Sequence, residues 1–538
     1  MPPAPGISSR IRDAVTGLSI AGLMLPEGIA YAQIAGLAPG RALIAAVAGG
    51  LAYALIGRSR FAVVSPTSSA AAILAAALAS LPGDAATREA AATALIAIVG
   101  LFFLGFAVFR LGGLAGFISR PVLRGFAFGL ALTIIIGQLP KLTAVAVPSG
   151  PIWTKLAVLG AALPRWHLAS LLLGGAALAA LLALRRLPQL PAALLVILAG
   201  IGLELFTDLH ALGIATTGRV TLELPGFAMP TALPEWPRLV QLAAPIALIL
   251  FAESWGTMRA LALKHGDRIS ANRELVALGA ANFAAAAVQG MPVGAGFSAG
   301  SANEAAGAAS RLSAAVGAAA LLLLALFAGD WIARIPEPIL AAVVIAALTH
   351  ALSPAPFVRL FRIARDQGTA LAAAAGVLAF GVLDGMLVAV ALSIANLLYD
   401  LSHPSISELG RVGESHDFVD VTRHPEARAI PGLAIFRPNA PLIFANAESL
   451  LAAIAQRALA RDAHCVVLSL EESNDLDSTA IDALDEFTGQ LGKAGRHVIL
   501  ARVHDRVREV LSKAGLDNLA AGSTFSVADA AALAAKEA

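Results

Sequence analysis

The sequence predicts an all-α polytopic membrane protein with fourteen spans in two related halves, followed by a small C-terminal α/β domain. Three observations lead to this fold class. First, the 538 residues are 58% hydrophobic and only 14% charged, whereas a soluble domain carries roughly a quarter charged residues. Second, apolar segments of about spanning length recur as far as Ser402. Third, two segments broken by proline or glycine occupy corresponding places along the chain, which indicates duplicated halves.

Fourteen apolar segments are long enough, or nearly long enough, to cross a bilayer. They cover residues 13–34, 40–57, 62–80, 90–109, 117–138, 168–184, 188–206, 238–259, 272–289, 297–309, 312–328, 337–352, 368–384 and 385–402. Loops on the same side of the membrane as the N-terminus carry more lysine and arginine than loops on the opposite side. Because cytoplasmic loops are enriched in these residues, both termini are expected in the cytoplasm. The segments define a transmembrane domain over 1–402, with repeats at about 12–206 and 238–402, in the cell inner membrane.

The composition of the chain changes after Ser402. Residues 403–430 are polar and charged and are interpreted as a linker. From 431 to 538, short strand patterns alternate with amphipathic helix patterns, which predicts a cytoplasmic α/β domain. In this domain Ser478 stands at a strand-to-helix turn, where an exposed hydroxyl could accept a regulatory phosphate. The alternative for Ser478 is a plain helix N-cap.

Two interrupted segments predict a binding site. Residues 61–78 end a β-branched run at Pro66 and then open a helix, and residues 289–307 combine an unwound entry with a half-length helix from about Ser298. Irregular backbone survives at membrane depth only where it lines an enclosed cavity, and helix N-termini attract anions. The alternative is two ordinary serine N-caps in close-packed helices. The predicted anion-binding residues are Tyr31, Pro66, Thr67, Ser68, Ser69, Phe297, Ser298, Ala299, Gly300 and Ser301.

Two acidic residues lie inside apolar segments, one ahead of each interrupted segment. Glu27 is costly to keep charged there and is predicted to bind a coupling proton; its alternative role is to pair with a structural cation or to cap a kinked helix. Glu253 and Thr257 share a helix face, so their oxygens could hold sodium, or the acid alone could hold a proton. The alternative for Glu253 is a hydrogen bond to the unwound backbone nearby. Apart from H⁺ or Na⁺, no cofactor is expected, because the sequence has no metal-ligand spacing and no Walker-type loop.

The first predicted span resembles the signature of the sulfate permease family (SulP, or SLC26) in the stretch LPEGIAYAQIAGLAP. The third and tenth spans of that family are similar to FAVVSPTSSAAA and GAGFSAGSANEAAGA, and its linker and STAS domain to VTRHPEARAIPGLAIFRPNAPLIFANAES and LDSTAIDAL. The resemblance implies a 7+7 inverted repeat with core and gate domains (a UraA-like fold), a homodimer, an anion held between the third and tenth spans, and elevator movement. It also implies proton coupling through Glu27 and sodium binding at Glu253 and Thr257. Ala299 departs from animal members, which often have arginine there.

The predicted function is secondary active transport of a small anion of the sulfate, bicarbonate or dicarboxylate class, by symport with protons or sodium. One alternative is a nucleobase:cation symporter of the same fold, which would need side chains that read the edges of a ring. Another is a membrane-anchored STAS sensor. No enzymatic activity is expected. The expected partners are the small inorganic or organic anion, membrane lipid, a second copy of the chain and a cytoplasmic regulator at the STAS domain, with no nucleic acid.

Overall fold

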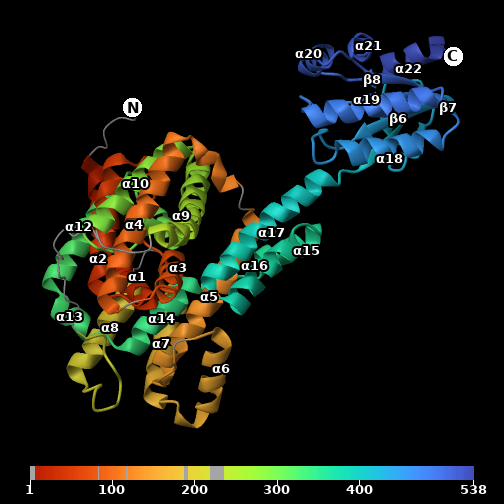
Figure 1. Ribbon diagram of the computed structural model, residues 1–538. Helices are drawn as coiled ribbons and strands as arrows, with labels where there is room; N and C mark the ends of the chain where they lie inside the picture. The colour runs from red at the N-terminus through yellow and green to blue at the C-terminus, as the bar shows by residue number, and fades with distance from the viewer. Residues whose placement is uncertain are drawn as a thin grey trace. The chain divides into compact units, whose positions relative to one another are not determined.

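The computed structural model of the protein describes residues 7–82, 84–116, 119–148, 150–186, 192–218 and 236–537. The chain forms two compact units that divide between Ser393 and Ile394, within one helix. The first unit is almost entirely helical, and the second combines a sheet with helices (Figure 1).

Each of the fourteen predicted spans contains a helix. These helices are α1 (Ile7–Ala35), α2 (Pro39–Ile56), α3 (Ser68–Ala79), α4 (Ala85–Val108), α5 (Arg120–Thr143), α7 (Leu168–Leu184), α8 (Ala192–Phe206), α9 (Trp236–His265), α10 (Ala271–Ala287), α11 (Phe297–Ala305), α12 (Leu312–Phe327), α14 (Glu337–Leu348), α16 (Gln367–Phe380) and α17 (Val382–Ser402). Shorter helices α6 (Ile152–Ala161), α13 (Gly329–Ala333) and α15 (Ala355–Ile363) lie between them. In the part of the chain that the structure describes, six helices are long and apolar enough for a simple span: α1, α2, α4, α5, α9 and α17.

Contacts between helices repeat from one half of the chain to the other. Helix α1 packs on α12, and its counterpart α9 packs on α4. Likewise α2 packs on α12 as α10 packs on α4, and α7 packs on α14 as α16 packs on α5. Each half therefore completes the packing of the other, as the predicted repeat requires. Two sets of helices result: the first helix group is α1–α4 with α9–α12, and the second helix group is α5–α8 with α14–α16.

Two short strands take the place of continuous helix in the interrupted segments. Strand β1 (Val64–Pro66) pairs antiparallel with β2 (Val293–Ala295), with Ser65 opposite Gly294. All six residues are buried. Each strand leads into a short helix, α3 of 12 residues and α11 of 9 residues. At 1.5 Å per residue these helices are about 18 and 14 Å long, so each covers only about half of a bilayer.

Asn282 on α10 holds β2 in place. Its Nδ2 donates to the carbonyl of Val293 at 2.9 Å, and its Oδ1 accepts from the Val293 N–H at 3.1 Å. Ser254 Oγ accepts from the Ala295 N–H at 2.9 Å. A Cβ atom at Gly294 would lie 2.6 Å from Leu250 Cδ2 and 2.8 Å from Ser254 Oγ, so a larger residue there would require these side chains of α9 to shift. Side chains thus satisfy backbone groups that a helix would otherwise pair.

Replacing Asn282 with leucine is expected to lower the stability of the folded protein by about 2 kcal/mol or more. The substitution leaves the N–H and carbonyl of Val293 buried without that partner, and an unmade buried hydrogen bond costs about 1–3 kcal/mol per group. Thermal unfolding of the detergent-purified protein measures the effect. Asn518→Leu, at an exposed position of the second unit, is the control. An equal melting temperature for the two variants would contradict the role given to Asn282.

The second unit contains a six-stranded mixed sheet with helices on it. Strands β6 (Gly432–Pro438), β7 (Ala463–Ser469) and β8 (His497–Ala501) are parallel neighbours. Helices α18 (Ala447–Leu459), α19 (Ser478–Lys493) and α20 (Asp505–Lys513) bury their apolar faces in one core beside the sheet, and α22 (Val527–Glu537) contributes to a second core. Helix α21 (Asp517–Ala521) completes the unit. The predicted α/β character of this region is confirmed.

The segment 403–430, which we expected to be a linker, belongs to this sheet. It contains β3 (Ile406–Val412), β4 (Phe418–Asp420) and β5 (Ala427–Arg428), and β3 pairs antiparallel with β6. Strands at the edge of a sheet keep many of their side chains in solvent, so polar residues are tolerated there. The polar composition that suggested a linker is therefore that of an edge hairpin.

Ser478 is exposed, but it does not cap its helix. Asp477 is the N-cap of α19, because its Oδ1 accepts from the Ala480 N–H at 2.9 Å. The alternative interpretation of Ser478 as the N-cap is therefore wrong. Its hydroxyl lies in the first turn of α19, where the helix dipole favours a negative group.

Asp420 is a pH-sensitive point of the second unit. Its carboxylate accepts hydrogen bonds from the Thr422 hydroxyl at 2.6 Å and the Ser407 hydroxyl at 2.7 Å, and these lower its pKa to about 2. Because the folded pKa lies below the ordinary value of about 3.9, the stabilisation is complete above about pH 5 and is lost as the pH falls from about 4 to 2.

Asp420→Asn is therefore expected to lower the stability of the second unit by about 1 kcal/mol at pH 7, a figure reduced for solvent screening. The difference from wild type should vanish near pH 2. Thermal unfolding of the full-length protein, followed across this range, measures it. A difference that is constant with pH would contradict the assignment.

Candidate functional site

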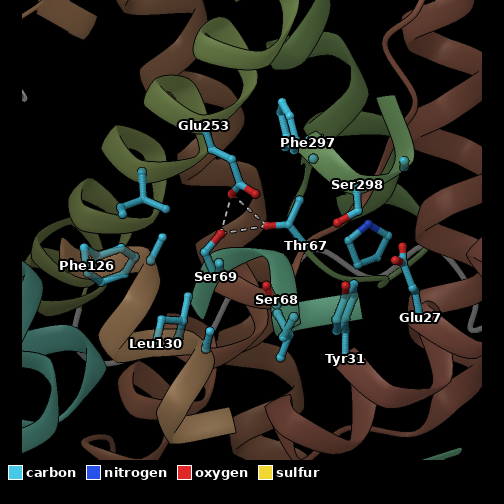
Figure 2. A pocket seen from close by; sticks show the side chains of 18 of the residues that line it. Glu27, Tyr31, Thr67, Ser68, Ser69, Phe126, Leu130, Glu253, Phe297 and Ser298 are labelled. Carbon is cyan, nitrogen blue, oxygen red and sulfur yellow. Dashed lines mark hydrogen bonds between the residues drawn. The ribbon is translucent and has the colours of Figure 1, made fainter. Parts of the chain in front are cut away.

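A cavity of about 210 Å³ lies where α3 and α11 begin. Figure 2 shows the side chains around it, with Glu253 and Glu27 reaching it from different sides. The cavity brings together most of the residues that the sequence singled out. They are Glu27, Tyr31, Pro66, Thr67, Ser68, Ser69, Glu253, Phe297, Ser298 and Ala299.

The first turn of α3 carries a network of hydroxyl groups. Thr67 is the N-cap, and its Oγ1 accepts from the Ala70 N–H at 3.3 Å. Thr67 Oγ1 and Ser69 Oγ share a hydrogen bond at 2.9 Å. Glu253 Oε2 accepts from Ser69 Oγ and, at 3.3 Å, from Thr67 Oγ1 (Figure 2). The acid of α9 is thus attached to the start of α3 by hydroxyl donors beside the positive end of a helix dipole.

The start of α11 has no such cap. Its N-cap residue is Gly296, which has no side chain to accept from the first N–H groups of the helix. Phe297 is 49% exposed and lines the cavity with Ser298. The positive end of the α11 dipole therefore faces the cavity without a side-chain oxygen from its N-cap.

Glu27 stands between two cavities. Its side chain is 6% exposed, and its Oε1 has no hydrogen-bond partner among the described residues. Besides the first cavity it lines a second one of about 540 Å³. Phe297 and Ser298 also line both. An unpartnered buried carboxyl oxygen is expensive unless it binds a proton or another ligand.

Three predicted residues do not line the first cavity. Ser301 lines the second cavity. A Cβ atom at Gly300 would lie 3.1 Å from Thr257 Cγ2, so these two residues form a close contact between α11 and α9. Glu253 accepts its hydrogen bonds from Ser69 and Thr67 at the start of α3. The binding roles of all these residues remain predictions.

Helix α5 supplies a wall that the sequence did not indicate. Leu123, Phe126, Ala127, Leu130 and Ala131 line the first cavity from this helix. In a span, apolar side chains that face a cavity look the same as those that face lipid or another helix. No signal in the sequence marked them.

Electrostatics limits what this cavity can do. It combines two helix N-termini and several hydroxyls, which attract an anion, with the carboxyl groups of Glu27 and Glu253, which repel one while they are charged. None of the described residues that line it is lysine or arginine. An anion is therefore bound best when protons or a cation neutralise the acids.

A model of the sulfate permease family matches residues 11–375, and a model of the STAS domain matches residues 424–531. The chain belongs to the sulfate permease family. A "Probable sulfate transporter MT1781" of Mycobacterium tuberculosis is 35% identical over 514 residues, which cover 94% of this chain and 91% of that protein. The predicted family is confirmed, and it is a family of transporters rather than enzymes.

Solved structures agree with the fold. Murine Slc26a9, an anion transporter solved in the inward-facing state, matches with a TM-score of 0.90 at 20% identity, over 100% of this chain and 93% of that one. The transmembrane domain of the cyanobacterium bicarbonate transporter BicA matches with a TM-score of 0.63 at 21% identity, over 72% of this chain and 98% of that one. This sulfate permease family member is thus a multi-pass membrane protein with a helical transporter domain and a C-terminal STAS domain.

Proposed function

We propose that the protein is a secondary active transporter that moves sulfate, or a related bicarbonate or dicarboxylate anion, together with protons or sodium. The observation that carries this proposal is that two helix N-termini and two buried acids line one cavity of about 210 Å³. A divalent anion beside two carboxylates is strongly repelled. Neutralising Glu27 and Glu253 removes this repulsion, so anion and cation bind together and release together.

The assignment of the two acids follows from their surroundings. Glu27 Oε1 has no partner among the described residues, which suits a proton carrier. Glu253 accepts from two hydroxyls at the start of α3, and these oxygens could also coordinate a hard cation such as sodium. Sulfate is the first substrate to test, because the relative from M. tuberculosis is named a probable sulfate transporter.

Movement of the first helix group against the second accounts for transport. The first group holds the two helix starts and both acids, and the second group contributes the apolar wall of α5. An apolar wall lets the loaded cavity slide past it without breaking hydrogen bonds. Lys141 of α5 donates to Gln33 Oε1 of α1. Gln33 follows the residues of α1 that line the two cavities. The contact therefore joins the two helix groups on the side of the first cavity that is opposite the second cavity.

The proposal includes a location in the cell inner membrane. The distribution of lysine and arginine among the loops supports an orientation with both termini in the cytoplasm. The second cavity then opens toward the cytoplasm. The proposal includes a homodimer and a regulator that binds the STAS domain. Ser478, exposed in the first turn of α19, is the proposed site of a regulatory phosphate.

Uptake by purified protein in liposomes tests the proposed function. Labelled sulfate, bicarbonate, chloride, oxalate, a C4-dicarboxylate and uracil are each offered with an inward proton gradient, with a sodium gradient and with neither. We expect sulfate uptake that one of the two gradients stimulates. Uptake that no gradient stimulates, or uptake of uracil instead of any anion, would contradict the proposal.

A further inference from the structure

The second cavity lies between the two helix groups. Its wall includes Thr16 and Ser19 of α1 and Ser301 of α11 from the first group, and residues of α8 and α14 from the second. It shares Glu27, Phe297 and Ser298 with the first cavity. An ion that leaves the first cavity on this side therefore enters the second one directly.

The two cavities differ in their charges. The described residues that line the first cavity include two acids and no lysine or arginine. Ala299 also lines this cavity. Among the described residues that line the second cavity, Arg185 is the one with a permanent positive charge, and Glu27 is the one acid. An anion that crosses from one cavity to the other therefore meets its first cationic side chain at Arg185.

Hydrogen bonds hold the Arg185 guanidinium at the edge of this cavity. Its Nη1 donates to Thr349 Oγ1 at 2.6 Å, and its Nη2 donates to the carbonyl of Ala346, which also lines the cavity. A positive charge at the C-terminus of α14 also stabilises that helix. A guanidinium has five N–H donors, so Arg185 can keep both bonds and still bind an anion.

We propose that Arg185 is the residue that attracts the transported anion into the second cavity and holds it there before or after the first cavity. This inference rests on the proposed function. Because Coulomb attraction scales with the charge of the ion, a single arginine holds divalent sulfate more strongly than a monovalent anion. Arg185 thereby contributes to selectivity for divalent anions, while the first cavity supplies the coupling acids.

Binding of radiolabelled sulfate to the purified full-length protein tests this inference. At an ionic strength of about 0.01 M, Arg185→Gln is expected to raise the Kd for sulfate about tenfold. At about 1 M, where the Debye length is only about 3 Å, the difference from wild type should shrink to about twofold. Arg185→Lys, which keeps the charge, should stay within about threefold of wild type at both ionic strengths.

Arg186→Gln is the matched control. Arg186 is the exposed neighbour of Arg185, it lines neither cavity, and its loss changes the net charge by the same amount. The Kd of this variant should stay within about twofold of wild type. Equal Kd values for the two glutamine variants would overturn the inference.

A purely structural role for Arg185 would give a different pattern. The loss would then be independent of salt and would not be rescued by lysine, and this result would also overturn the inference. Uptake by the wild type in liposomes separates the two proposals. Wild-type protein that neither binds nor moves sulfate would overturn both, whereas normal wild-type uptake with no special effect of Arg185→Gln would overturn only this one.

Discussion

Glu27→Gln is expected to abolish the stimulation of anion uptake by an inward proton gradient. A gradient of one pH unit supplies about 1.4 kcal/mol per coupled proton, which corresponds to about tenfold accumulation. The variant should show a ratio of about one between uptake with and without the gradient. Glutamine keeps the size of the side chain but cannot bind and release a proton, and Glu27 is buried with an oxygen that lacks a partner among the described residues.

The control for this prediction is Glu89→Gln. Glu89 lies on α4, and its side chain is 54% exposed beside Arg41. This variant should keep the full response to the proton gradient. Anion binding by the Glu27 variant, measured without a gradient, should persist or become tighter, since a charge that repels the anion is gone. An unchanged gradient response in Glu27→Gln would refute the coupling role.

The second large effect is expected at Glu253. Glu253→Gln removes the charge that accepts from Ser69 and Thr67, and coupled uptake should fall about 100-fold because both the proposed cation site and the start of α3 are altered. Ser69→Ala, which removes one hydrogen bond to a charged group, should cost about 2 kcal/mol, or about 30-fold. Initial rates of uptake in liposomes, with and without sodium, measure both effects.

Thr257→Val separates two interpretations of this acid. The resemblance to relatives implied that Thr257 completes a sodium site with Glu253, whereas the structure gives Glu253 its partners on α3 and places the Thr257 methyl group against Gly300. If Glu253 acts with Ser69 and Thr67 at the start of α3, the Thr257→Val variant should keep most of the anion uptake and its stimulation by sodium. A loss as large as that of Ser69→Ala would favour the sodium site of Glu253 and Thr257 expected from the sequence.

Much of the site could be predicted from the sequence because its residues are energetically unfavourable inside an apolar, membrane-spanning segment. Glu27 and Glu253 are acids in apolar segments, and Pro66 and Gly296 interrupt helices where no water can satisfy the backbone. Such residues stand out one at a time, without knowledge of their neighbours in space. The fourteen spans and the α/β character of the C-terminal domain follow from local patterns in the same way.

Only the tertiary structure decided which residues meet. The wall of α5, the contact of Thr257 with Gly300, the place of Arg185 beside the second cavity and the pairing of β3 with β6 depend on how distant segments pack. Alanine, leucine and glycine occur all along this chain, so many packings are compatible with the same local pattern. The free-energy cost of burying an acid or a helix-breaking residue in a membrane depends on that residue and its sequence neighbours, so it can be read from the sequence. Which residues lie close together depends on many weak contacts between whole helices, so it is known only from the folded structure.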